Sequence, residues 1–247
     1  MSLNMWQRAV AVLTVLMVFA FVGRAEGASI GGFWINVSGG GTSFKINDGG
    51  AGDLDVATNN EIEFPPSTAV GSAYCINPID PTKPIATATA AGGGYKLTLT
   101  NVEIVAKSDN VIGVIQLGGM WTHAAFSGNL GVNLDGTATT TSTSDGYSMS
   151  ASSTVHPPTS GGPEAATSLS GTGTGPFSSS ATTPMTLAAG THQVLFTMGF
   201  SIEKAGTTLF LPNSGDSIAI PYAVPAPGAG VAGLGLMGLI GGRRRKR

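Results

Sequence analysis

Short runs of alternating polar and apolar residues, separated by turn-forming sequences, fill the middle of this chain and restrict it to β folds. The run 95–100, Tyr-Lys-Leu-Thr-Leu-Thr, alternates with period two, as a half-buried strand does. Outside the two ends, no segment has the apolar spacing of an amphipathic helix. We therefore predict an all-β body, an antiparallel β-sandwich or jelly roll, between an N-terminal signal helix and a short C-terminal hydrophobic helix. Further predicted strands occupy 32–37, 61–64, 193–200, 207–211 and 217–222.

One tight-turn sequence predicts a hairpin within this body. Ser108-Asp109-Asn110 separates two strand-like runs, 102–107 and 111–117. Asp and Asn favour turns because their side chains hydrogen-bond nearby backbone groups and tolerate left-handed backbone conformations. We therefore expect the two runs to pair with each other.

Residues 137–184 are rich in Ser, Thr, Gly and Pro and have few large apolar side chains. Asp145-Gly146 predicts a second hairpin, between 137–144 and 147–155. The prolines and glycines of His156–Glu164 predict a loop. The rest fits either thin, Thr-rich edge strands or a flexible stretch that carries O-linked glycans.

The predicted body, residues 26–223, is acidic. It contains all fourteen acidic residues, five lysines and no arginine, a net charge of −9. Nucleic-acid binding is excluded, because phosphates require clustered Lys and Arg. The single cysteine, Cys75, has no partner for an intramolecular disulfide. We predict that Cys75 is a small buried residue; a free thiol that pairs between chains is the alternative.

Residues 1–25 have the pattern of a secretory signal peptide. Arg8 is the only charge before an apolar stretch, 9–22, and Gly23 and Ala25 stand at −3 and −1 of a cleavage site after Ala25. We predict export through the Sec machinery with removal of the signal at that site. An uncleaved membrane anchor is the alternative.

The last twenty-four residues combine three elements. A Pro-bracketed tetrapeptide, Val224-Pro225-Ala226-Pro227, precedes an uncharged run of fifteen residues, 228–242. As a helix this run is about 22 Å long, shorter than a bilayer core of about 30 Å, so it suits temporary retention. The basic end, Arg243-Arg244-Arg245-Lys246-Arg247, should stay cytoplasmic. A disordered end with a basic patch for nucleic acid is the alternative. The residues that we assign to membrane retention are Gly228, Leu234, Leu236, Met237, Leu239 and Ile240.

The order and spacing of these elements resemble the PEP-CTERM sorting tail, which bacterial exosortases recognise and process in exported proteins. The resemblance covers residues 224–247 only. The usual signature of that family is Val-Pro-Glu-Pro, and Ala226 stands in place of the glutamate. The resemblance implies an exosortase-like partner, transient retention in the inner membrane, cleavage near 225–227, and delivery to the cell surface or the extracellular matrix of a Gram-negative-type bacterium.

The sequence lacks the signatures of common hydrolases. The one Gly-x-Ser-x-Gly match, Gly27-Ala28-Ser29-Ile30-Gly31, is not followed by a predicted helix, so it lacks the strand-turn-helix context of a nucleophile elbow. His123, His156 and His192 are scattered without a His-Glu-x-x-His pair, and we expect turn or surface residues there. We predict a protein that is not an enzyme.

Glu61 and Glu63 resemble a catalytic carboxylate pair in their distance alone. Two residues apart on one strand, they point to the same side with a separation of roughly 6–7 Å. We interpret them as a solvated strand face. The alternative is a secreted glycosidase that uses both carboxylates.

The segment 47–55, Asn-Asp-Gly-Gly-Ala-Gly-Asp-Leu-Asp, contains three aspartates in a Gly-rich turn. Calcium takes several oxygen ligands from such loops, which makes Asp48, Asp53 and Asp55 candidate ligands. The segment fits neither an EF-hand nor the Gly-Gly-x-Gly-x-Asp repeat, and a polar turn between strands is the other interpretation. No other cofactor is expected.

We conclude that the sequence favours an exported, non-enzymatic surface or matrix protein with a structural or adhesive role. Its low charge and many hydroxyls suit weak, multivalent association with extracellular polysaccharide or with itself. A carbohydrate-binding, lectin-like module, assisted by calcium at the three aspartates, is the main alternative.

Overall fold

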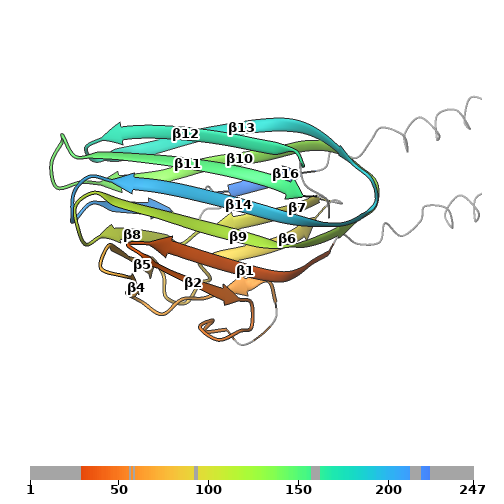
Figure 1. Cartoon of the computed structure of the whole chain (residues 1–247), viewed down its shortest axis with the longest axis horizontal. Coiled ribbons are helices and arrows are strands. Elements are labelled where there is room, and N and C mark those ends of the chain that lie inside the picture. Colours follow the sequence, from red (N-terminus) through yellow and green to blue (C-terminus); the bar gives the residue numbers. More distant parts are fainter. Residues whose placement is uncertain are drawn as a thin grey trace, which may run out of the picture.

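The computed structural model describes residues 29–55, 57, 59–91, 94–156, 162–211 and 218–222. These residues form β-strands and no helix. The strands make two antiparallel sheets, called A and B, which pack face to face (Figure 1). The predicted all-β antiparallel body is therefore confirmed. The two predicted terminal helices lie outside the described residues.

Sheet A has six strands in the order β12-β11-β14-β9-β1-β2, and sheet B has ten. The strands of sheet A are β1 (Ser29–Gly39), β2 (Thr42–Asn47), β9 (Val111–His123), β11 (Gly146–His156), β12 (Glu164–Thr172) and β14 (Gly190–Ile202). The strands of sheet B are β3 (Glu61–Ile62), β4 (Thr68–Val70), β5 (Tyr74–Pro78), β6 (Ala86–Ala91), β7 (Gly94–Leu99), β8 (Val102–Ala106), β10 (Phe126–Thr139), β13 (Gly175–Leu187), β15 (Thr208–Leu211) and β16 (Ile218–Tyr222).

Long, regular strands run side by side in sheet A (Figure 1). Successive side chains point to opposite faces of a strand. In β9 the inward side chains of Ile115, Leu117 and Trp121 are fully buried, whereas Ile112 and Met120 on the other face are exposed. The face turned away from sheet B is called the outer face of sheet A. The side chains on this face are exposed or half-buried.

Aromatic pairs join the two sheets in the core. Tyr95 of β7 lies 4.9 Å from Trp121 of β9, measured between ring centroids, and Tyr74 of β5 lies 5.0 Å from Phe200 of β14. Tilted and edge-on pairs at such distances are favoured by the quadrupole of the rings. The hydroxyl of Tyr74 donates to the carbonyl of Ser38 at 2.9 Å, so its polar end is satisfied.

Sheet B is interrupted where sheet A is continuous. Its longest strand, β10, pairs with β13 along one edge, and along the other edge first with β16 and then with β15. Beyond these, β7 and β8 follow each other in one row, β7 beside β16 and β8 beside β15. Asn101 separates the two, with a left-handed φ of 56°.

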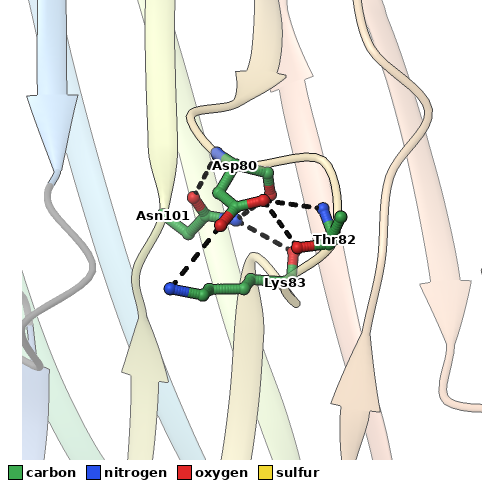
Figure 2. A network of polar contacts seen from close by, with 4 residues as sticks. All are labelled: Asp80, Thr82, Lys83 and Asn101. Atoms are coloured by element: carbon green, nitrogen blue, oxygen red, sulfur yellow. Dashed lines mark hydrogen bonds and ion pairs between the residues drawn. The ribbon is translucent and has the colours of Figure 1, made fainter.

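The fully buried side chain of Asn101 fastens the loop 79–85 to this break (Figure 2). Its amide nitrogen donates to the carbonyls of Asp80 and Lys83 at 2.8 and 2.9 Å, and its oxygen accepts from the backbone nitrogen of Asp80 at 2.7 Å. Asparagine suits the position because it tolerates a left-handed backbone and satisfies local backbone groups. The Asn101 side chain thus provides three hydrogen bonds at the point where the strand pairing of sheet B is interrupted.

Both predicted hairpins are wrong. β8 pairs with β5 and β15 in sheet B, whereas β9 pairs with β1 and β14 in sheet A. In the same way, β10 lies in sheet B and β11 in sheet A. Both turns therefore carry the chain from one sheet to the other. A turn sequence shows that the chain reverses, but the partner of each strand is set by the inward side chains of the whole core.

The Ser- and Thr-rich section is mostly strand. The predicted strand 147–155 is confirmed by β11, whereas β10 ends at Thr139, short of the predicted Ser144. Two strands, β12 and β13, account for most of the part that the sequence left open. The predicted loop separates β11 from β12, and its residues 157–161 lie outside the described part. Cys75 is buried on β5, as predicted.

Candidate functional site

A β-bulge in β1 turns Trp34 onto the outer face of sheet A. Gly31 lies opposite Met120 and Trp34 lies opposite Gly118, so β1 has one residue more than β9 between these pairs. The extra residue is accommodated by Gly32, whose φ of 60° favours glycine. Without this shift, strict alternation from the inward Ile30 would direct Trp34 into the core.

Trp34 lies over a strand position that has no side chain. A Cβ added to Gly118 would come within 2.4 Å of the six-membered ring of the indole, so the ring fills the space above that glycine. On the neighbouring strand β2, the amine of Lys45 lies 4.4 Å from the ring centroid. Trp34 is half-buried and Lys45 is exposed. We call these three residues the Trp34 platform.

A row of polar side chains crosses three strands beside the platform. The amide nitrogen of Asn36 donates to the amide oxygen of Gln116 at 3.1 Å, and the amide nitrogen of Gln116 donates to the hydroxyl of Thr197 at 3.4 Å. Asn36, Gln116 and Thr197 are direct cross-strand neighbours on β1, β9 and β14. We call this row the amide ladder. Mutual hydrogen bonds hold the amides in one orientation before any ligand arrives.

Strands β1, β2, β9 and β14, which form this part of the face, contain no aspartate or glutamate. Apolar atoms flank the polar row, since Met120 and Ile112 of β9 are 45% and 69% exposed. The face therefore combines an indole, oriented amides, hydroxyls and exposed aliphatic groups. This part of the face can bind a ligand through contact and hydrogen bonds.

Two histidines that are far apart in the sequence meet at one end of sheet A. Nε2 of His123 lies 2.9 Å from Nδ1 of His192, and the His123 ring stacks on Trp121 at 3.8 Å. Both histidines are buried, so the expectation of turn or surface residues is wrong for them. Burial, and then repulsion by His192, lower the pKa of His123, against the opposing effect of the Ala124 carbonyl. Sixty-nine residues separate them, and only the β9–β14 register brings them together.

The three aspartates proposed as calcium ligands are engaged with their own loop. The Asp53 carboxylate accepts hydrogen bonds from the backbone nitrogens of Gly49, Asp55 and Glu63 at 2.9–3.2 Å. Asp55 accepts from Asn59, and Asp48 accepts from the backbone nitrogen of Asn60. Among the described residues, no group of three or more His, Cys, Asp or Glu side chains is placed to hold a metal ion. The geometry is that of a polar turn.

Glu61 and Glu63 flank the buried Ile62 at β3, and both are half-buried. The pKa of Glu63 is raised by burial and by the nearby carboxylates of Asp55, Asp53 and Glu61. This acidic group lies at the edge of sheet B, beside the loop that follows β2.

The other predicted site residues lie outside the described part of the chain. They are the signal cleavage site at Ala25, the sorting motif 224–227, the retention segment 228–242 and the basic end 243–247. Within the described ranges, no helix is long and apolar enough to cross a membrane.

Comparisons with known proteins leave the family open. No family model matches the chain, and no curated protein resembles its sequence. Among solved structures, the carbohydrate-binding module TmCBM61 in complex with beta-1,4-galactotriose is 13% identical over 59% of this chain and 86% of its own, with a TM-score of 0.28. The enzymatically active domain of bacteriophage CBA120 tailspike protein 4 is 10% identical over 51% of this chain and 18% of its own, with a TM-score of 0.17. Both TM-scores are too low for either likeness to bear on function.

Proposed function

We propose that the described domain is a non-enzymatic adhesion module that holds a polysaccharide on the outer face of sheet A. The observation that carries this proposal is the Trp34 platform beside the amide ladder. The two groups together match the two kinds of surface that a sugar presents.

A pyranose ring has one apolar face of C–H groups, and the negative face of an aromatic ring attracts such groups. The Trp34 ring packs into the space above Gly118, so it loses little conformational freedom when a ligand binds. Lys45 competes for the ring through a cation–π contact worth about 0.5–1 kcal/mol at an exposed site. Because its side chain is exposed, Lys45 can swing aside and donate to a sugar hydroxyl.

Sugar hydroxyls require partners that both donate and accept. Asn36 and Gln116 each have an amide with two donors and an oxygen acceptor, and the ladder uses only part of this capacity. The neighbouring strands present no carboxylate, and this supports binding without hydrolysis.

The sequence of the two ends supports a location for this activity. A signal peptide cleaved after Ala25 would export the domain. The tail 224–247, by its resemblance to PEP-CTERM sorting tails, would retain it briefly in the inner membrane until an exosortase-like enzyme cuts near 225–227. The domain would then meet polysaccharide at the cell surface or in the extracellular matrix.

Retention on insoluble polysaccharides tests this function. The full-length chain in detergent is passed over cellulose, chitosan and calcium alginate beads, together with the variants Trp34→Ala and Ile79→Ala. Ile79 is 46% exposed in a loop of sheet B and controls for the loss of an exposed apolar side chain. We expect the unaltered chain and Ile79→Ala to be retained on a neutral or amine-bearing matrix, and Trp34→Ala to pass through. Equal retention of all three proteins, or retention of none, would contradict the proposal.

A further inference from the structure

A pocket lies on sheet A, at the end of its strands opposite the histidine pair. It is an open pocket of about 430 Å³ where β11, β12 and β14 meet. Three serines from three adjacent strands stand in one cross-strand row in its wall, with Ser148 between Ser170 and Ser201. The full lining is Gly146, Tyr147, Ser148, Ser170, Gly171, Thr172, Ser201 and Glu203.

Tyr147 packs on the other face of sheet A, beneath this pocket. It alternates with the outward Ser148, its side chain is 7% exposed, and its ring lies 5.9 Å from that of Phe177 in the core. An added Cβ at Gly171 would come within 2.6 Å of its hydroxyl. Tyr147 therefore supports the strands of the pocket from the inner face and does not face the serines.

Glu203 gives the pocket a negative charge. One carboxylate oxygen accepts from the backbone nitrogen of Gly146 at 3.1 Å, and no cation of the described residues pairs with it. The adjacent Lys204 is ion-paired with Asp109 at 2.8 Å; Asp109 chiefly, with Asp145 and Glu203, raises its pKa. Asp145 is buried beside the same turn, where Thr141 and the backbone nitrogen of Ser142 donate to it. The charge around the pocket is therefore negative overall.

We propose that this pocket is a second contact for the same polysaccharide and that it selects a sugar unit with a free amine. This inference rests on the proposed function. The ammonium group of a hexosamine pairs with Glu203, and the hydroxyls of the sugar bond to the three serines. An uronic-acid polymer is disfavoured, because it would place like charges together.

The separation of the two contacts fixes the length of the ligand. Along β14, the row of the Trp34 platform, at Leu195, and the row of the pocket, at Ser201, are six residues apart. Six residues span about 20 Å of strand, and the two sheet spacings from β9 to β11 add about 10 Å across the sheet. Only an oligomer of several sugar units reaches both contacts, and its path crosses the amide ladder.

Calorimetry with glucosamine oligomers tests this inference. The probes are the trimer and hexamer of β-1,4-glucosamine and the corresponding N-acetylated hexamer, titrated into the full-length chain in detergent at pH 6. We expect the amine-bearing hexamer to bind about fivefold more tightly than the acetylated one, a ratio that matches an exposed ion pair. We also expect it to bind more tightly than its trimer.

Two variants separate the inference from the function on which it rests. Glu203→Gln should bring the amine-bearing and acetylated hexamers to equal affinity. The matched control Glu164→Gln, an exposed glutamate at the far end of β12, should keep the fivefold ratio. An unchanged ratio in Glu203→Gln, or no preference for the amine in the unaltered chain, would overturn the inference and leave the platform intact. Binding that survives Trp34→Ala at full strength would overturn the proposed function itself.

Discussion

Sheets A and B cover the same core with different constructions. Four of the six strands of sheet A have eleven or thirteen residues, whereas eight of the ten strands of sheet B have six residues or fewer, and Asn101 lies at the break between β7 and β8. Long uninterrupted strands line up side chains from separate parts of the chain into rows, and the amide ladder is such a row. In the interrupted sheet B, the buried side chain of Asn101 instead forms hydrogen bonds with the loop 79–85. Changes on the outer face of sheet A should therefore affect binding, and changes at the break in sheet B should affect stability.

The largest effect that we expect is on stability, at the break in sheet B. Asn101→Ala removes three hydrogen bonds of a fully buried side chain, at about 1 kcal/mol each, and so costs about 3 kcal/mol of folding free energy. Thermal unfolding followed by circular dichroism should show Tm lower by about 10 °C. Asn101→Gly should recover about 1 kcal/mol of this loss, because glycine accepts the left-handed φ. A Tm within 2 °C of the unaltered chain in both variants would refute this role for Asn101.

At the Trp34 platform we expect a large effect on binding and a small effect on stability. Trp34→Ala should weaken binding of the polysaccharide ligand by about 2 kcal/mol, roughly thirtyfold, as loss of an aromatic hot spot does. Its Tm should change little, because the ring packs on the outer face and not in the core. Calorimetry and thermal unfolding of the same preparation measure both quantities. A large fall in Tm with unchanged affinity would reverse the assignment of the two sheets.

Gly118 offers a finer test of the platform, because it changes no ligand contact directly. Gly118→Ala places a Cβ where the indole ring now lies and should displace Trp34, with a loss of affinity of about fivefold, or about 1 kcal/mol. Gly31→Ala, on the same face, is the matched control, since no atom lies within 4 Å of its added Cβ. Equal affinities for both variants would mean that the position of the ring over Gly118 is unimportant.

The smallest effect should come from the histidine pair. Because burial lowers the pKa of His123 in the folded state, the unfolded chain binds more protons once the pH falls below about 6.5. Stability should therefore decrease as the pH falls from 7.5 towards 5. His123→Gln should remove a few degrees of the pH-dependent change in Tm, and His156→Gln, at the end of β11, should not. A pH profile that is identical in both variants would show that the pair carries no such linkage.

The sequence shows which segments are strands more reliably than it shows how they pair. Period-two alternation marks β14, which buries one face along its length. It also marks β7, although Lys96 is the one residue of that strand that is not buried. The alternation does not show which strands pair with each other. Two segments, Ser108-Asp109-Asn110 and Asp145-Gly146, have hairpin-turn sequences and yet connect strands of different sheets. Buried contacts between distant strands decide that choice.

The candidate site was harder to predict than the fold. Asn36, Gln116 and Thr197 lie up to 161 residues apart and become neighbours only through the register of three strands. The one local signal was Gly31-Gly32 before Phe33-Trp34, a pattern typical of a bulge that redirects an aromatic side chain. The aspartates of 47–55 had the more familiar pattern, but their oxygens accept hydrogen bonds from the loop itself.

The most direct test of the central claim is a map of the bound face. Backbone amide chemical shifts of the isotope-labelled full-length chain in detergent would be compared without and with the polysaccharide fragment that retains it best. We expect the largest shifts at Trp34, Asn36, Gln116 and Thr197, across β1, β9 and β14, with sheet B unaffected. Shifts centred on the outer face of sheet B, or on the aspartate loop 47–55, would contradict the claim that the outer face of sheet A is the binding surface.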